Sequence, residues 1–249
     1  MKIAVAGKGG AGKTTISGTI SRALARAGQQ VIALDADANP MLGVSLGVGP
    51  EETDRLAAVR QALDAGEVEH ATSVEGLVDT FGTGAPDGVR LVVATRIEND
   101  KPSCPCCGVS PQQMLDELER KDGRVVVADL EAGVGTLLRM GPGQVDYVLV
   151  VANPSAKSIE VARRTIEIAA DRGPITVIAN RVRDEADLEA IASALDGHEL
   201  FVIPEEPAIA LADREGVAPI DVDEDAPGVK AVLELADRLA GGAVLSGAR

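Results

Sequence analysis

All three cysteines of this chain lie within four positions, in the stretch Lys101–Gly108, which reads KPSCPCCG. Thiolates are soft ligands that suit Zn²⁺ and can also bind Ni²⁺. Cys104 and Cys106 are separated by one residue, whereas Cys107 adjoins Cys106, and adjacent cysteines cannot easily both face one ion. The cluster predicts a metal site, and it leaves a redox-active thiol pair or chemically inert cysteines as alternatives.

One copy of the chain offers too few ligands to close such a site. A structural zinc site takes four protein ligands, and no histidine adjoins the cluster, because His70 and His198 are far away in the sequence. Two copies related by a twofold axis would supply four thiolates from Cys104 and Cys106. We therefore expect a Ni²⁺ or Zn²⁺ site shared by two copies, with Cys107 as an additional candidate ligand.

A phosphate-binding loop stands near the N-terminus. Gly7–Thr14 reads GKGGAGKT, which fits G-x-x-x-x-G-K-[ST], follows an apolar run typical of a strand and opens a helical pattern. Glycines let backbone N–H groups converge on phosphate oxygens, and the helix N-terminus adds its positive dipole. Lys13 would reach the β- and γ-phosphates, and the Thr14 hydroxyl would bind Mg²⁺. The residues expected to contact a nucleotide here are Gly9, Gly10, Ala11, Gly12, Lys13, Thr14 and Thr15.

Acidic residues end two of the apolar runs. Asp35 and Asp37 follow the apolar residues of VIALDADANP, and Asp129 ends RVVVAD. Carboxylates at positions i and i+2 can position a metal ion and activate a water molecule, although an Asp-x-Asp pair alone also fits a turn. Asp129 has the position of a Walker B aspartate. The segment Asp129–Gly135 that it opens has the glycine hinge of a switch that senses the γ-phosphate, and Glu131 inside it has no assigned role.

Composition excludes several classes of protein. The net charge is −15, Lys and Arg are scattered along the sequence, and aromatic residues make up 1%. We therefore expect neither a basic patch nor the stacking platforms of single-stranded nucleic acid binders. No apolar run reaches the roughly 20 residues of a membrane span, and none resembles a signal peptide. These features predict a cytoplasmic protein, with reduced thiols, that binds neither nucleic acid nor membrane.

Short apolar runs alternate with helical patterns, which predicts an α/β fold: a mostly parallel, twisted sheet of about seven or eight strands with helices on both faces. We expect one domain over residues 1–240 and a flexible tail over 241–249. The predicted strands are 2–6, 30–35, 89–95, 124–129, 146–152, 175–180 and 199–204. The predicted helices are Lys13–Ala27, Asp54–Ala65, Pro111–Lys121, Ser158–Asp171, Glu185–Leu195 and Val229–Ala240, and Asp79–Gly88 is predicted to be a loop.

The second lysine of the loop allows a family assignment. Lys8–Thr14 reads KGGAGKT, which resembles the deviant Walker A family of P-loop ATPases that contains MinD, ParA, the nitrogenase iron protein and metal-insertion ATPases. In that family the extra lysine, here Lys8, crosses a dimer interface to the partner's nucleotide. The resemblance implies a slow ATPase that forms an ATP-stabilised homodimer. It also implies that Asp37 orients the attacking water, and that Asp35 and Asp129 lie near Mg²⁺.

The resemblance extends to the base of the nucleotide. It implies that Asn180, at the end of ITVIAN, binds the adenine edge and that Pro204, Glu205 and Glu206 close over the base. Asn180 alone also fits a turn, which is the weaker alternative. No guanine-specifying N-K-x-D motif is present, so we expect ATP and ADP to be the ligands.

Within the family, three features resemble the CooC-type nickel-insertion ATPases of carbon monoxide dehydrogenase: MKIAVAGKGGAGKTT, DLEAG, and a C-x-C pair before the Asp129 strand. The resemblance implies a metallochaperone that delivers nickel to carbon monoxide dehydrogenase or a related metalloenzyme, using Cys104 and Cys106. A positioning or partition ATPase of the MinD/ParA type is the alternative. An iron–sulfur electron donor fits less well, because Ala132–Gly135 contains no cysteine.

Overall fold

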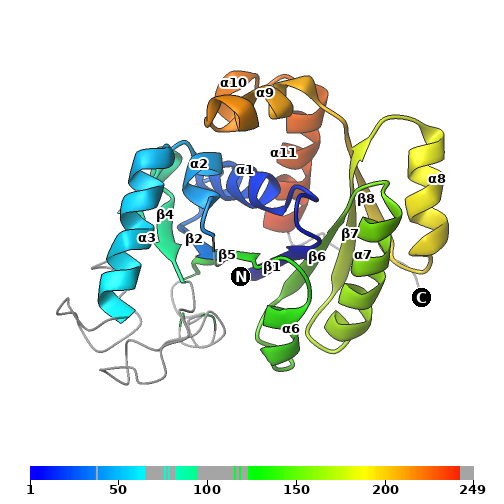
Figure 1. Ribbon diagram of the computed structural model, residues 1–249, viewed down its shortest axis with the longest axis horizontal. Helices are drawn as coiled ribbons and strands as arrows, with labels where there is room; N and C mark the ends of the chain where they lie inside the picture. The colour runs from blue at the N-terminus through cyan, green and yellow to red at the C-terminus, as the bar shows by residue number, and fades with distance from the viewer. Residues whose placement is uncertain are drawn as a thin grey trace.

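The computed structural model describes residues 1–37, 39–64, 76, 78, 82–94, 115, 118 and 123–241. Its centre is an eight-stranded sheet with the order β3-β4-β2-β5-β1-β6-β7-β8 (Figure 1). Every neighbouring pair is parallel except β3 and β4, which are antiparallel. The strands are β1 (Lys2–Gly7), β2 (Val31–Ala36), β3 (Thr83–Gly84), β4 (Arg90–Val93), β5 (Val125–Leu130), β6 (Tyr147–Ala152), β7 (Ile175–Val182) and β8 (Glu199–Pro204).

The seven predicted strands are confirmed, and their burial explains why the sequence predicts them well. Every residue of β1, β2 and β5 is buried, which is what a parallel strand covered on both faces requires. The short strand β3 was not predicted, because two residues carry no periodic pattern. It lies in the predicted loop Asp79–Gly88, of which residues 82–88 are described.

Helices cover both faces of the sheet (Figure 1). Residues 3 and 5 of β1 pack into one apolar cluster with α1, α2, α3 and α11, and residues 4 and 6 pack into the other with α6, α7 and α8. This alternation places helices in two layers, as predicted. The helices are α1 (Lys13–Arg26), α2 (Leu42–Leu46), α3 (Pro50–Asp64), α6 (Gly135–Arg139), α7 (Ala156–Ala169), α8 (Glu185–Ala194), α9 (Pro207–Glu215), α10 (Pro219–Val222) and α11 (Pro227–Ala240), with a 3₁₀ turn at Pro86–Gly88.

The helices α2, α6, α9 and α10 were not predicted, because none is longer than nine residues and their apolar positions are too few to show a period. The predicted helix Pro111–Lys121 falls outside the described residues apart from Leu115 and Leu118, which are both buried. The predicted tail lies beyond Gly241 and also falls outside them. Among the described residues, no helix has both the length and the apolar character that a membrane crossing requires.

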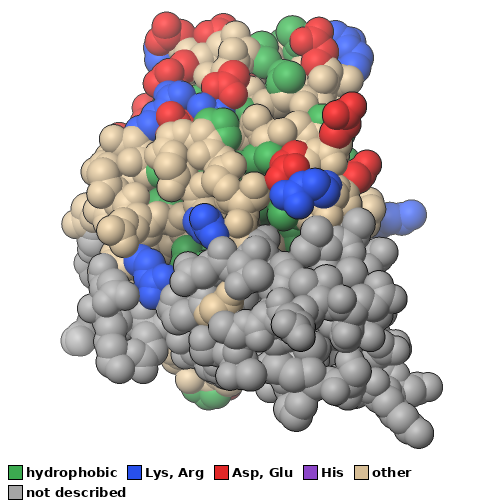
Figure 2. Space-filling view, turned by 90° about the vertical axis from the view of Figure 1, so that its left-hand side faces the viewer, with side chains coloured by type: hydrophobic (Ala, Val, Ile, Leu, Met, Phe, Trp, Pro, Cys, Tyr) green, Lys and Arg blue, Asp and Glu red, His purple; other side chains and the backbone are tan. Residues whose placement is uncertain are grey.

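Ion pairs fasten α1 to elements far away in the sequence. Arg22 is 3% exposed and donates to Asp87 at 2.6 Å and to Asp221 of α10. Arg26, one turn later, pairs with Asp87 at 3.0 Å and with Glu224 at 2.9 Å. Acidic and basic side chains are accordingly interspersed over the described part of the face shown in Figure 2. These contacts hold α10 and the 3₁₀ turn against the helix that follows the phosphate loop.

Candidate nucleotide-binding site

The loop between β1 and α1 has the backbone that phosphate binding needs. Gly7 has a φ of 145°, and a Cβ atom there would lie 2.4 Å from the Val151 carbonyl oxygen, so only glycine fits. Gly12 has a φ of 106° and is the N-cap of α1. Because a glycine cap supplies no side-chain acceptor, the first N–H groups of this 14-residue helix remain available to an anion.

The two lysines of the loop have different surroundings. Lys13 is 6% exposed and begins α1. Lys8 is partly exposed, and its ammonium donates a hydrogen bond to the Gly9 carbonyl at 3.1 Å. A buried lysine beside the loop amides suits phosphates bound in the same chain. An exposed lysine is free to reach beyond the chain.

Asp129 is the penultimate residue of β5 and lies close to the start of α1. It is 1% exposed, and its carboxylate accepts hydrogen bonds from Thr14 and from the Ser17 hydroxyl, the latter at 3.3 Å. Burial raises the pKa of Asp129 above its ordinary value, although the hydrogen bond from Thr14 and the charge of Lys13 act in the opposite direction. A carboxylate and a hydroxyl side by side are oxygen ligands of the kind that Mg²⁺ prefers.

Asp35 is paired in register with Asp129 across β2 and β5, and it is fully buried. Its two carboxylate oxygens accept the backbone N–H groups of Leu42 at 2.7 Å and Asp37 at 3.2 Å. Burial, followed by the charge of Asp129, raises the pKa of Asp35. Asp35 therefore organises the turn that carries Asp37. Asp37 itself is partly exposed, and its carboxylate accepts the Asn39 N–H at 2.9 Å.

The predicted switch lies against the phosphate loop. The N–H of Gly133 donates to the Gly7 carbonyl at 3.1 Å, which forms an isolated antiparallel bridge between the two segments. The helix α6 begins two residues later, at Gly135. A ligand that moves the phosphate loop would therefore act directly on the backbone that leads into α6.

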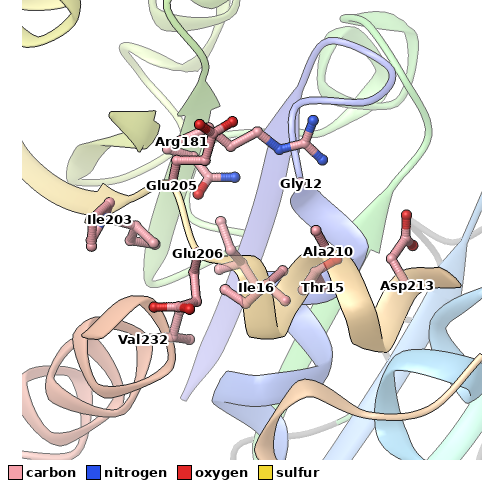
Figure 3. Close-up of a pocket in the computed structure, with 13 residues that line it drawn as sticks. Gly12, Thr15, Ile16, Arg181, Ile203, Glu205, Glu206, Ala210, Asp213 and Val232 are labelled. Atoms are coloured by element: carbon pink, nitrogen blue, oxygen red, sulfur yellow. The ribbon is translucent and has the colours of Figure 1, made fainter. Parts of the chain in front are cut away.

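A cavity of about 250 Å³ opens beside Gly12 (Figure 3). Asn180, which is 7% exposed, lines it, and its side-chain amide donates to the Ala11 carbonyl at 2.8 Å. Pro204, Glu205 and Glu206 also line it. The structure thus brings together the base-binding residues that the sequence predicted and joins them to the phosphate loop.

Several lining residues of this cavity were not predicted. The apolar ones come from α1, β8, α9 and α11, and they are Ile16, Ile203, Ile209, Ala210 and Val232. Arg181 and Asp213 stand at its polar margin. Only the fold brings these residues together, and no local motif marks them. Glu206, which was predicted, also caps α9, since it precedes Pro207 and accepts the Ala208 N–H at 3.1 Å.

The predicted cysteine site falls outside the described residues, since Cys104, Cys106 and Cys107 lie between Ala94 and Leu115. The described chain leaves the sheet at Ala94, whose N–H donates to the Asp35 carbonyl at 2.7 Å. Within the described ranges, no group of three or more His, Cys, Asp or Glu side chains is arranged to hold a metal ion.

The fold and loop define a P-loop nucleotide-binding protein. Residues 2–220 match the CobQ/CobB/MinD/ParA nucleotide binding domain, and the chain belongs to that family. It is 34% identical to an uncharacterized ATP-binding protein of Methanocaldococcus jannaschii, over 74% of this chain and 76% of the relative. It is 29% identical to the carbon monoxide dehydrogenase accessory protein CooC of Rhodospirillum rubrum, over 89% of this chain and 90% of the relative. The MinD cell division protein of Aquifex aeolicus matches in structure with a TM-score of 0.70 and 26% identity, over 96% of each chain. The predicted family and fold class are confirmed.

Proposed function

We propose that this protein is an ATP-hydrolysing metallochaperone that holds one Ni²⁺ or Zn²⁺ ion between two copies of the chain and delivers nickel to a client metalloenzyme. The observation that carries the proposal is a juxtaposition along the chain. The first cysteine of the chain, Cys104, comes ten residues after Ala94, and Ala94 is hydrogen-bonded to Asp35 at the acidic end of the nucleotide site. The similarity to CooC supports carbon monoxide dehydrogenase, or a related enzyme, as the client.

The hydrolytic part of the proposal rests on side chains that converge at the carboxyl end of the sheet. The loop amides and Lys13 would hold the phosphates, and Thr14 and Asp129 would hold Mg²⁺, which neutralises charge on the γ-phosphate. Asp37 leaves the turn that Asp35 organises, and it would orient the attacking water. Asp35, which is paired in register with Asp129, would lie near the Mg²⁺ ion.

The switching part rests on one contact and on the exposure of Lys8. Gly133 is bonded to Gly7, so loss of the γ-phosphate would be felt in the segment leading to α6. Lys8 is exposed enough to reach a second copy, and ATP would therefore favour a closed homodimer. Closure would bring Cys104 and Cys106 of each copy into one four-thiolate site, and hydrolysis would separate the pairs and weaken the hold on the cargo ion.

Metal content measured by elemental analysis, on protein purified without a chelating tag, tests the proposal. We expect half an equivalent of nickel or zinc per subunit after loading in the presence of ATP. Cys104→Ser and Cys106→Ser should each abolish binding, and Cys107→Ser is the matched control that should retain at least part of it. A dimer that takes up no metal in any nucleotide state would contradict the metallochaperone role.

A second candidate is a nucleotide-switched positioning or partition ATPase, which the structural match to MinD over nearly the whole chain favours. This role predicts ATP-dependent polymers, or ATPase activity stimulated by DNA or by anionic vesicles. Those assays, run on protein in which all three cysteines are serine, separate the two functions. The metallochaperone would be inactive in them.

A further inference from the structure

Arg181 occupies an unusual backbone position at the end of β7. Its φ is 60°, in the left-handed region, and Asp87 is the only other described non-glycine residue with a positive φ. In the pairing of β7 with β8, Asn180 lies opposite Ile203 and Val182 lies opposite Pro204, so Arg181 is an extra residue in the ladder. Bulges of this kind redirect side chains and are common beside active sites.

The bulge sends the Arg181 side chain to the mouth of the cavity. Arg181 is exposed, lines the cavity and extends toward Gly12 (Figure 3). Among the described residues, no carboxylate forms an ion pair with its guanidinium. Its neighbour Arg183, by contrast, pairs with Asp187 at 2.8 Å and does not line the cavity. Of these two arginines, Arg181 has the strained backbone and, among the described residues, no ion-pair partner.

The shape of the cavity indicates what Arg181 would contact. Ile16, Ile203 and Val232 give the cavity an apolar side. A flat aromatic ring that lies on these side chains keeps its other face toward the opening, where Arg181 stands. A planar, weakly hydrated guanidinium is well suited to cover such a face.

We propose that Arg181 is a nucleotide-positioning residue whose guanidinium stacks on the purine base and closes the open side of the base pocket. The inference rests on the proposed nucleotide binding and adds a residue to it. A non-glycine residue in the left-handed region persists only where the surroundings maintain it, and such strain is concentrated at ligand sites. Binding of the base supplies a reason for an arginine at a position where glycine fits better.

Calorimetric titration of ADP and of adenosine tests the proposal. We expect Arg181→Ala to weaken both ligands by about 5- to 30-fold, a range that corresponds to about 1 to 2 kcal/mol for a desolvated stacking contact. Arg181→Lys should weaken them similarly, because the ammonium keeps the charge but lacks the plane. Arg183→Ala is the matched control and should leave both affinities unchanged.

A further variant separates binding from folding. Arg181→Gly should weaken both ligands while the melting temperature stays equal or rises, because glycine tolerates a φ of 60°. Unchanged affinities in the Arg181 variants would overturn the inference. The inference would also be overturned if Arg181→Ala weakened ADP but not adenosine and Arg181→Lys bound ADP as tightly as wild type. That pattern would mean that Arg181 contacts a phosphate through its charge. Wild-type protein that binds no ADP would instead overturn the proposed function.

Discussion

The side-chain amide of Asn180 donates a hydrogen bond to the backbone carbonyl of Ala11 at 2.8 Å, across 169 residues of sequence. This contact fixes the orientation of the amide, because the nitrogen is committed to the phosphate loop. The second N–H of the amide and its carbonyl oxygen remain to meet a base, and the oxygen is the acceptor that an adenine amine would need. Adenine presents an amino donor at its position 6, whereas guanine presents an acceptor there. In the proposed nucleotide site, the contact would therefore link phosphate binding to the choice of base.

Replacing Asn180 should reduce base selectivity more than phosphate binding. Asn180→Ala removes the acceptor for the adenine amine, and we expect ATP affinity to fall by about tenfold, the effect of one lost hydrogen bond in a buried site. GTP affinity should change much less, which provides the control within the same variant. Competitive titration with the two nucleotides measures the ratio. A variant with the wild-type preference for ATP would exclude this role for Asn180.

Gly12 leaves the space that the Asn180 side chain occupies beside the phosphate loop. A Cβ atom at Gly12 would lie 2.2 Å from the Asn180 amide nitrogen, at a φ of 106°. Gly12→Ala should therefore displace Asn180, abolish measurable nucleotide binding and lower the free energy of unfolding by about 1 to 3 kcal/mol. For the stability measurement, Gly10→Ala is the matched control for backbone strain, because its φ is 75° but nothing lies within 4 Å of the added atom.

Chemical denaturation of the double variant Gly12→Ala/Asn180→Ala checks the cause. If the clash is what destabilises Gly12→Ala, removing the Asn180 side chain should recover part of the lost stability, so the two effects will not add. Additive losses would show that the two residues act independently.

The sequence predicted those parts of the molecule that depend on local pattern. β1, β2 and β5 are buried on both faces and therefore read as unbroken apolar runs. The phosphate loop is equally local, because glycines and a lysine at fixed spacing are sufficient to define it. The parallel direction of the strands follows from their alternation with helices.

The parts that the sequence did not reveal depend on contacts between distant segments. Arg22 finds Asp87 and Asp221 at separations of 65 and 199 residues, and no periodicity marks such pairs. The apolar lining of the cavity beside Gly12 is assembled from four elements. The bulge at Arg181 appears only in the pairing of β7 with β8. Asp35 was predicted beside the magnesium ion, and the structure adds that it holds the Asp37 turn through backbone amides.

The two lysines of the loop should separate binding from association. Lys13→Ala removes a buried cation beside the phosphate site and should abolish ATP binding. Lys8→Ala changes a partly exposed side chain whose one hydrogen bond in the described chain is to Gly9. It should retain ATP affinity within about threefold but lose the dimer that ATP promotes, as measured by light scattering with ATP and with ADP. Equal loss of ATP binding in both variants would contradict a role for Lys8 across the interface.

The ion pair between Arg22 and Asp87 predicts a pH dependence of stability. Burial acts to raise the pKa of Asp87, but the hydrogen bonds and charges of Arg22 and Arg26 outweigh it, so the pKa lies below its ordinary value of 3.8. A carboxyl whose pKa is lower in the folded state stabilises the fold above pH 4, and this contribution is lost as the pH falls through the folded-state value. Asp87→Asn should therefore lower the free energy of unfolding at pH 7 by about 1 to 2 kcal/mol.

Urea denaturation between pH 2.5 and pH 7 provides the measurement. Below pH 4 the wild-type stability should fall toward that of Asp87→Asn, because both then lack the charge at position 87. Asp225→Asn is the control, since Asp225 also pairs with a cation, Lys230, but its side chain is 89% exposed. An exposed pair contributes little, so this control should follow the wild-type curve. A gap between wild type and Asp87→Asn that stays constant down to pH 2.5 would mean that packing around Arg22, rather than the charge of Asp87, holds α1 to its neighbours.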